Sequence, residues 1–367
     1  MKYEYWFAKI KGVRADKKKF LHERMKTAEA LYYSEEETLK KLGVLNDKER
    51  TSILKATKQT DLQEEYERML EKKIQLITCF SEQYPRELME IPDPPYALYV
   101  KGKLPDKEEK KIAIVGSRRC TPYGEKYAVD FGEKLAKSGI QVISGMARGI
   151  DGMGHRGALM AGGKTFAVLG CGSDVCYPKE HIGLYVDILE RGGGIISEFP
   201  PGTPPYAYNF PARNRIISGM SECIIVIEAG KKSGSLITVD MALEQGRDVY
   251  ALPGPINSEM SEGCNYLIKQ GAGIILSPEM LLDEISVSYE RLNEQCENVQ
   301  KNHKNEKMLE TPEELLYSCL GLYPMGVEDL MKKTKMDIKK VMEALISLEL
   351  DGYIKEISKN MYVRCVV

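Results

Sequence analysis

The stretch KIAIVGSRRCTPYGEKYAVDFGEKLAKSGIQVIS, residues 111–144, decides the fold class. An apolar run, a glycine-bearing loop, a helical stretch and a second apolar run follow one another here, and the alternation continues to about residue 285. The further apolar runs are TFAVL (165–169), GIIS (194–197), CIIVIE (223–228), DVYAL (248–252) and GIIL (273–276). Such runs, separated by helices, are typical of a doubly wound, mostly parallel sheet buried on both faces. The sequence therefore predicts an α/β fold with its ligand at the carboxyl ends of the strands.

Three segments flank this core, which we place at residues 78–285. Residues 1–77 predict a small domain of short helices, of the SAM or helix-hairpin-helix kind, in which packing is favoured over DNA binding because the hairpin glycine, Gly43, sits in a poor turn. Residues 286–310 are polar and charged, which predicts a linker. Residues 311–367 predict three helices and a two-stranded wing, the order of a winged helix.

Composition excludes several classes of protein. The 367 residues are 43% apolar and 29% charged, as in ordinary globular domains, and the net charge of −2 predicts a local rather than a global nucleic-acid footprint. No apolar run reaches the roughly 18 residues of a membrane helix, and no signal peptide is visible, so we expect a cytoplasmic protein without membrane contact. The nine cysteines form no CxxC pair and match none of the four histidines in spacing, so we expect free thiols and no metal.

The loop after the first core strand is the first candidate anion site. Gly116, Ser117, Arg118 and Arg119 precede a helix that we expect from about Tyr123. Glycine permits close approach of a phosphate, the guanidinium can hold two of its oxygens, and the helix start adds a partial positive charge. The alternative is a tight turn with solvated arginines.

The next two strands also end in glycine-bearing loops. The candidate residues are Arg148 and Gly149 after the second strand and Gly170 and Gly172 after the third. Neither loop carries a complete dinucleotide fingerprint, so we interpret both as a surface that nucleic acid runs over and expect no cofactor. Asp151 is a candidate helix cap. His155, a conceivable general base, has no nucleophile or metal ligand at a matching spacing and is interpreted as a structural or ligand-contacting residue.

Two later segments complete the candidate site. An aromatic ring on which bases can stack, next to guanidiniums that hold phosphates, suits single-stranded nucleic acid, although a buried ring with ion-paired arginines is the alternative. A second loop before a helix repeats the anion-site pattern. The residues concerned are Phe210, Arg213, Asn214 and Arg215 in the first segment, and Lys231, Lys232, Ser233 and Gly234 in the second.

These motifs together resemble those of the DNA processing protein A family, also called DprA or Smf. The resemblance rests on Val115-Gly116-Ser117-Arg118, residues 144–151 (SGMARGID), Tyr177-Pro178, residues 210–217 (FPARNRII) and residues 233–238 (SGSLIT). It implies an extended Rossmann-like core with a helical amino-terminal domain and a winged helix. It also implies a non-enzymatic protein that binds incoming single-stranded DNA in natural transformation, loads the RecA recombinase and forms a homodimer through the core. The DNA contacts it implies fall on Gly116, Ser117, Arg118 and Phe210, with the motif's arginines at Arg213 and Arg215.

The sequence departs from the family at one point. Many members carry a lysine just before the Phe-Pro, but residues 203–209 (TPPYAYN) contain none, so we expect Tyr206, Tyr208 and the Lys231-Lys232 pair to contribute more. The winged helix is near neutral and could contact protein as readily as duplex DNA.

Two other functions remain open. A nucleotide phosphoribohydrolase of the lysine-decarboxylase-like family would share the layout, but its PGGxGTxxE motif is replaced by KSGSLITVD at residues 232–240. A pure adaptor would bind no oligonucleotide.

Overall fold

The computed structural model describes residues 1–57, 61–285, 312–320, 325–350, 353–358 and 361–364. The chain divides into two compact units, Met1–Ser288 and Tyr289–Val367. The linker predicted at residues 286–310 lies outside the described residues.

A nine-stranded sheet organises the described part of the first unit, in the order β1-β2-β6-β5-β4-β3-β7-β8-β9. Strands β3 to β9 run parallel to their neighbours, whereas β2 pairs antiparallel with β6 and β1 antiparallel with β2. The parallel strands are β3 (Lys111–Val115), β4 (Gln141–Ser144), β5 (Thr165–Leu169), β6 (Gly194–Ser197), β7 (Cys223–Val226), β8 (Asp248–Ala251) and β9 (Gly273–Ile274). Each of the seven predicted runs contains one of these strands, which confirms the doubly wound α/β fold.

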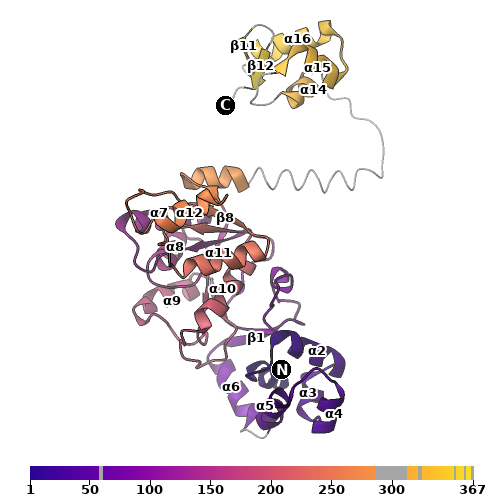
Figure 1. Ribbon diagram of the computed structural model, residues 1–367, viewed down its shortest axis with the longest axis vertical. Helices are drawn as coiled ribbons and strands as arrows, with labels where there is room; N and C mark the ends of the chain where they lie inside the picture. Colours follow the sequence, from indigo (N-terminus) through magenta and orange to yellow (C-terminus); the bar gives the residue numbers. More distant parts are fainter. Residues whose placement is uncertain (58–60, 286–311, 321–324, 351–352, 359–360, 365–367) are drawn as a thin grey trace. The chain divides into compact units, whose positions relative to one another are not determined.

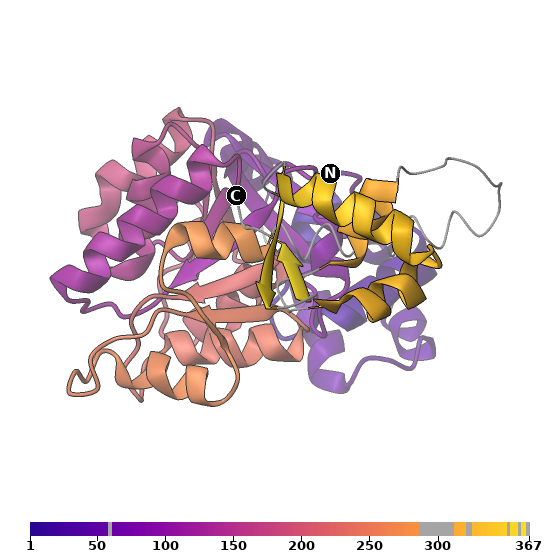
Figure 2. The ribbon, with the colours of Figure 1, turned by 90° about the horizontal axis from the view of Figure 1, so that it is seen from above.

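Helices cover both faces of this sheet (Figures 1 and 2). Side chains of β3 alternate, so that Ile112 and Ile114 join the apolar core under α7 and α8, whereas Ala113 and Val115 join the core under α10, α11 and α12. Helix α9 packs on β5 and β6. The bounds are α7 (Pro122–Lys137), α8 (Ile150–Met160), α9 (Ile182–Glu190), α10 (Asn209–Gly219), α11 (Ser235–Glu244) and α12 (Glu262–Lys269).

The amino-terminal segment is helical, as predicted, and packs on the edge of the sheet. Its helices are α1 (Lys2–Lys9), α2 (Ala15–Met25), α3 (Ala28–Tyr32), α4 (Glu36–Lys41), α5 (Asp47–Thr57) and α6 (Leu62–Glu71). Trp6 and Phe7 share one core with Tyr99 of the sheet, so the helices and the strands bury each other.

The segment from Ile74 to Lys103 is more regular than its four prolines suggest. Prolines are typical of irregular segments, but this one forms β1 (Ile74–Thr78) and β2 (Ala97–Gly102), with a short 3-10 helix, η1 (Arg86–Met89), between them. The prolines lie outside the strands, where they remove no ladder hydrogen bond. The expected boundary after residue 77 therefore falls inside β1.

The second unit has the predicted winged-helix order. It contains α14 (Pro312–Cys319), β10 (Met325–Gly326), α15 (Val327–Thr334), α16 (Ile338–Leu350), β11 (Ile354–Ser358) and β12 (Met361–Arg364). The strands form a small sheet in the order β10-β12-β11. Leu316, Leu330, Leu345 and Tyr362 belong to its own apolar core, so this unit buries its own apolar side chains.

Candidate functional site

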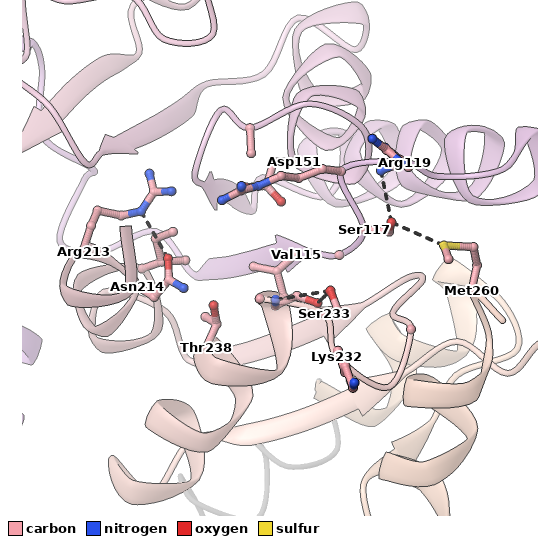
Figure 3. A pocket seen from close by; sticks show the side chains of 17 residues that line it. Val115, Ser117, Arg119, Asp151, Arg213, Asn214, Lys232, Ser233, Thr238 and Met260 are labelled. Carbon is pink, nitrogen blue, oxygen red and sulfur yellow. Dashed lines mark hydrogen bonds between the residues drawn. The ribbon is translucent and has the colours of Figure 1, made fainter. Parts of the chain in front are cut away.

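A pocket of about 470 Å³ opens where β3 and β7 lie side by side. The chain proceeds from β3 toward β6 on one side and from β7 toward β9 on the other, so this is the point where the strand order reverses. Open α/β sheets bind ligands at such a switch point. Figure 3 shows Ser117 and Arg119 on the loop after β3 and Lys232 and Ser233 on the loop after β7.

The pocket brings together predicted residues from the loop after β3, the loop after β7 and helix α10. Those that line it are Gly116, Ser117, Arg118, Arg119, Arg213, Asn214, Lys232, Ser233 and Gly234. Sequence reasoning left out Ser235, Thr238 and Met260, which also line it. Ser235 and Thr238 stand within the SGSLIT motif, whereas no signal near Met260 indicated its place.

The loop after β3 is held firmly at its base. Ser117 N–H donates to the Glu228 carbonyl at 2.7 Å, and the Ser117 hydroxyl accepts from Arg119 N–H at 3.1 Å. Gly149 has φ +69°, and a Cβ there would stand 2.3 Å from the Ser117 carbonyl oxygen, so only glycine fits against this loop. Arg118 and Arg119 are exposed. Within the described chain, neither guanidinium has an ion-pair partner, so both can receive a phosphate.

The start of α7 is not available to an anion, contrary to our expectation from the sequence. The buried carboxylate of Glu228 accepts from Thr121 N–H at 2.8 Å and from the Thr121 hydroxyl at 2.6 Å. A carboxylate at a helix N-terminus is itself favourable, and it takes the place that a phosphate would need. Anion binding beside β3 therefore falls to the arginine side chains.

The loop after β7 differs because α11 begins at the pocket without an acidic cap. Gly234 is the N-cap residue of α11, and the Ser233 and Ser235 hydroxyls lie 2.7 Å apart beside it. Lys232 is exposed and makes no ion pair with any described side chain. Positive charge from the helix end and from this ammonium converges here.

Arg213 lies at the back of the pocket but is buried, with 4% of its surface exposed. Its Nη1 donates to the carbonyls of Gly145, at 3.0 Å, and Val168, and its Nε donates to Asn214 Oδ1 at 3.3 Å. Burial lowers the pKa of Arg213 to about 10, so it stays charged at neutral pH. The side chain anchors α10 to the ends of β4 and β5, and its charge acts on the pocket from beneath.

Asp151 stands beside Arg213 and is also buried. Its carboxylate accepts from Gly145 N–H at 3.2 Å, so it fixes the loop after β4 rather than capping α8. Burial raises the pKa of the Asp151 carboxyl, although the Arg213 charge partly opposes that rise.

Phe210 extends the site beyond the pocket. The Arg118 guanidinium lies 5.7 Å from the centroid of the Phe210 ring, and the exposed Tyr177 ring lies 5.5 Å from it on a tilted plane. Gly170 permits this arrangement, since a Cβ there would meet the Phe210 ring at 2.8 Å. The half-buried Phe210 ring therefore lies next to the arginines of the loop after β3. Tyr177, which we had not assigned to the site, lies beside the same ring.

The remaining candidates do not line the pocket. Arg215 donates to Glu198, at 2.8 Å, and to Asp93, at 3.2 Å, with 12% of its side chain exposed. Arg148 pairs with Glu180. Lys231 pairs with Glu262 at 3.2 Å, and Gly172 N–H donates to the Thr203 carbonyl at 2.9 Å. For Arg215, the alternative of an ion-paired arginine matches the geometry.

His155 occupies a structural position. It is fully buried, and its Nδ1 lies 2.6 Å from the Thr165 hydroxyl, which donates to the Val142 carbonyl and so accepts from the imidazole. Burial lowers its pKa to about 3, so it is neutral at physiological pH. In the parts of the chain with described coordinates, no cluster of His, Cys, Asp or Glu could hold a metal, and no helix could cross a membrane.

Comparison with known proteins gives consistent matches over most of the chain. Residues 75–286 match the family model of DNA recombination-mediator protein A, and residues 301–358 match that of the DprA winged helix domain. The chain is 42% identical over 290 residues to Protein Smf of Escherichia coli (strain K12), across 79% of this chain and 77% of that protein. It is 43% identical over 218 residues to DNA processing protein DprA of Streptococcus pneumoniae, across 59% and 77%.

Two solved structures are similar as well. The X-ray structure of DNA processing protein A from Streptococcus pneumoniae superposes with a TM-score of 0.67 and 34% identity, over 77% of this chain and 98% of that one. DNA processing protein A from Helicobacter pylori, solved in work on its single-stranded DNA binding mode, superposes with a TM-score of 0.51 and 29% identity, over 59% and 98%.

Proposed function

The chain belongs to the family of DNA recombination-mediator proteins A, which includes DprA and Smf, and from this premise we propose that it binds single-stranded DNA along the carboxyl edge of its sheet. The family is one of DNA-binding mediators and not of enzymes. The observation that carries the proposal is the row formed by Arg118, Arg119 and Lys232 around one pocket, with the Phe210 ring beside it. Cations along a groove with an aromatic face suit a single strand.

In this proposal each group has a distinct part. Arg118, Arg119 and Lys232 hold phosphates, and the helix start behind Ser233 and Gly234 adds its partial charge. Phe210 offers a face to an unpaired base, which a base in duplex DNA cannot reach. Arg213 contributes long-range positive potential from its buried position and makes no direct phosphate contact.

We extend the proposal to the partners that the family resemblance implies. The chain delivers the bound strand to the RecA recombinase, forms a homodimer through its core and acts in the cytoplasm. Filament formation by RecA on single-stranded DNA should start sooner when the chain is present. Sedimentation over a range of concentrations should show a monomer–dimer equilibrium. A recombinase rate unaffected by the chain would contradict the loading role.

The deciding experiment is a titration with a fluorescent oligo-dT of about 20 nucleotides and a duplex of the same length, repeated across salt concentrations. We expect the single strand to bind more tightly and both affinities to fall with salt. Equal affinity for the two DNAs would contradict the proposal, and absence of binding to either would favour the adaptor.

A nucleotide hydrolase is the second candidate, and the same samples test it. Such an enzyme needs a carboxylate that reaches its substrate, and Asp151 is the one carboxylate among the described lining residues. Asp151 is buried and bonded to Gly145 N–H, so we expect no release of base from nucleoside monophosphates.

A further inference from the structure

A second pocket, of about 340 Å³, lies away from the first, between the amino-terminal helices and the core. The turn after α1 and the start of α2 form one wall, and residues 198–209, which lead from β6 to α10, form the other. A neighbouring hollow of about 640 Å³ shares Lys9, Lys11 and Thr203 with it and adds Lys55. We call the two hollows together the seam. Both walls belong to the first unit.

Lys18 is an unusual residue on the wall of the seam, because its side chain is buried with 6% of its surface exposed. Its Nζ donates to the Ala8 carbonyl at 2.7 Å and lies 6.0 Å from the ring centroids of Phe7 and Tyr96. An ammonium group has three donors, and among the described residues one acceptor is within hydrogen-bond distance. The structure therefore places a buried cation with spare donors beside a pocket.

The electrostatics of Lys18 match this geometry. Burial lowers its pKa to about 7, and the Glu198 carboxylate partly opposes that shift. The cations of Lys9 and Lys11 also line the pocket, although Lys9 pairs with Glu65. An anion entering the seam would favour the charged form of Lys18 and gain a partner for its unused donors.

The opposite rim carries two exposed aromatic rings. Tyr206 and Tyr208 stack with their centroids 5.4 Å apart and their planes 6° from parallel, and they are 44% and 72% exposed. One residue, Asn209, separates Tyr208 from Phe210, so their Cα atoms are at most about 7 Å apart. Such rings are sequence-tolerant platforms for bases.

We infer that the seam is a second nucleotide-binding subsite for the same single strand, in which a base stacks on the Tyr206–Tyr208 pair and Lys18 holds a phosphate. This inference rests on the proposed function. The strand passes from the first pocket over Phe210 to the two tyrosines and then to the lysines of the amino-terminal helices. The lysine that residues 203–209 lack is thus replaced by cations from another part of the chain.

The test compares two oligo-dT lengths on the full chain, one of about 6 nucleotides that fits the first pocket and Phe210, and one of about 20 that reaches the seam. The double variant Tyr206→Ala/Tyr208→Ala should bind the long oligomer about tenfold more weakly, the loss of one stacked base, and the short one as the parent does. Tyr206→Phe/Tyr208→Phe keeps the rings and should bind both lengths normally. Tyr266→Ala is the matched control, because it removes from α12 a tyrosine whose exposure lies between those of Tyr206 and Tyr208.

Lys18→Met, which keeps the buried stem, should reduce the salt dependence for the long oligomer alone. If the alanine double variant binds the long oligomer as the parent does while Phe210→Ala weakens both lengths, the seam is not a subsite and the proposed function stands. Equal weakening of both lengths by the double variant would place the tyrosines in the first site and overturn the inference. If the parent chain binds neither length, the proposed function fails and the inference with it.

Discussion

The loop after β3 and the loop after β7 lie next to each other, and each leads from a buried strand into a helix. At the first, the buried Glu228 carboxylate occupies the start of α7 through Thr121. At the second, α11 starts from Gly234, and none of the described acidic side chains caps it. Glu228 lies just after β7, at the beginning of the second loop. A residue of the second loop therefore caps α7, the helix that follows the first loop.

Because α7 is capped by Glu228 and α11 is not capped by any described acidic side chain, the two loops would hold a phosphate in different ways. A helix start binds an anion through backbone N–H groups, which are fixed and need no further ordering. Side chains such as Arg118 must be ordered when the ligand binds, although their charge reaches farther. The pocket therefore has a preorganised wall at α11 and an adaptable wall at the loop after β3, where Arg118 also lies over Phe210.

Removing the Glu228 carboxylate should produce the largest effect on stability, because this group holds the start of α7 through Thr121. In Glu228→Ala the Thr121 donors lose their acceptor, and hydrogen bonds to a charged group contribute about 1.5–3 kcal/mol each, so we expect a loss of about 3 kcal/mol in the free energy of unfolding. Urea denaturation measures it. Glu222→Ala, an exposed site just before the same strand, is the control. If the two variants were equally stable, α7 would not depend on this carboxylate.

Gly124→Ala should disturb the same contact, between Glu228 and Thr121, from within α7. The new Cβ would lie 2.4 Å from Glu228 Oε2, so the carboxylate must leave Thr121. Overpacking of this kind costs about 1–3 kcal/mol, which exceeds the gain of up to about 1 kcal/mol in helix propensity. Thermal unfolding should show a lower midpoint. Gly183→Ala in α9, where a Cβ meets nothing within 4 Å, should not lower it. A stabilised Gly124→Ala would show that Glu228 moves without cost.

Phe210→Ala separates the contribution of base stacking to DNA binding from that of the neighbouring cations. Loss of a stacked base should weaken single-stranded DNA binding by about 1–3 kcal/mol. Since no charge is removed, the slope of log affinity against log salt should stay the same. Fluorescence titration at several salt concentrations measures both quantities. A changed slope would mean that Phe210 acts by positioning Arg118 rather than by stacking.

Much of this arrangement was predictable from the sequence, for a definite physical reason. Strands buried on both faces must be apolar throughout, so the seven core strands were visible, and parallel strands bring their following loops to one edge. The winged helix was visible from its order of elements. Phe210 and Arg118 could be assigned to one edge of the sheet in the same way. In the structure the Arg118 guanidinium lies 5.7 Å from the centroid of the Phe210 ring.

The parts that sequence could not give depend on contacts between distant residues. Glu228 ends the run CIIVIE and has no local sign of its bond to Thr121. Arg213 stands in an arginine-rich motif typical of a surface, but its acceptors are carbonyls at the ends of β4 and β5. The seam could not be predicted because its two walls, residues 8–18 and residues 198–209, are far apart in the sequence.

The smallest expected effect is a difference in DNA affinity between Arg118→Ala and Lys232→Ala, the variants that each change one wall of the pocket. Each removes one phosphate contact, so each should lower the salt slope by about 0.7 to 1. Arg118→Ala should lose more affinity at equal salt, because it also removes the cation over Phe210. Lys232→Ala should lose less, since the partial positive charge of the α11 start remains beside the phosphate. Lys269→Ala, an exposed lysine on α12, should change neither quantity. If Lys232→Ala lost more affinity than Arg118→Ala, the open helix start would contribute nothing, and the two loops would differ only in their side chains.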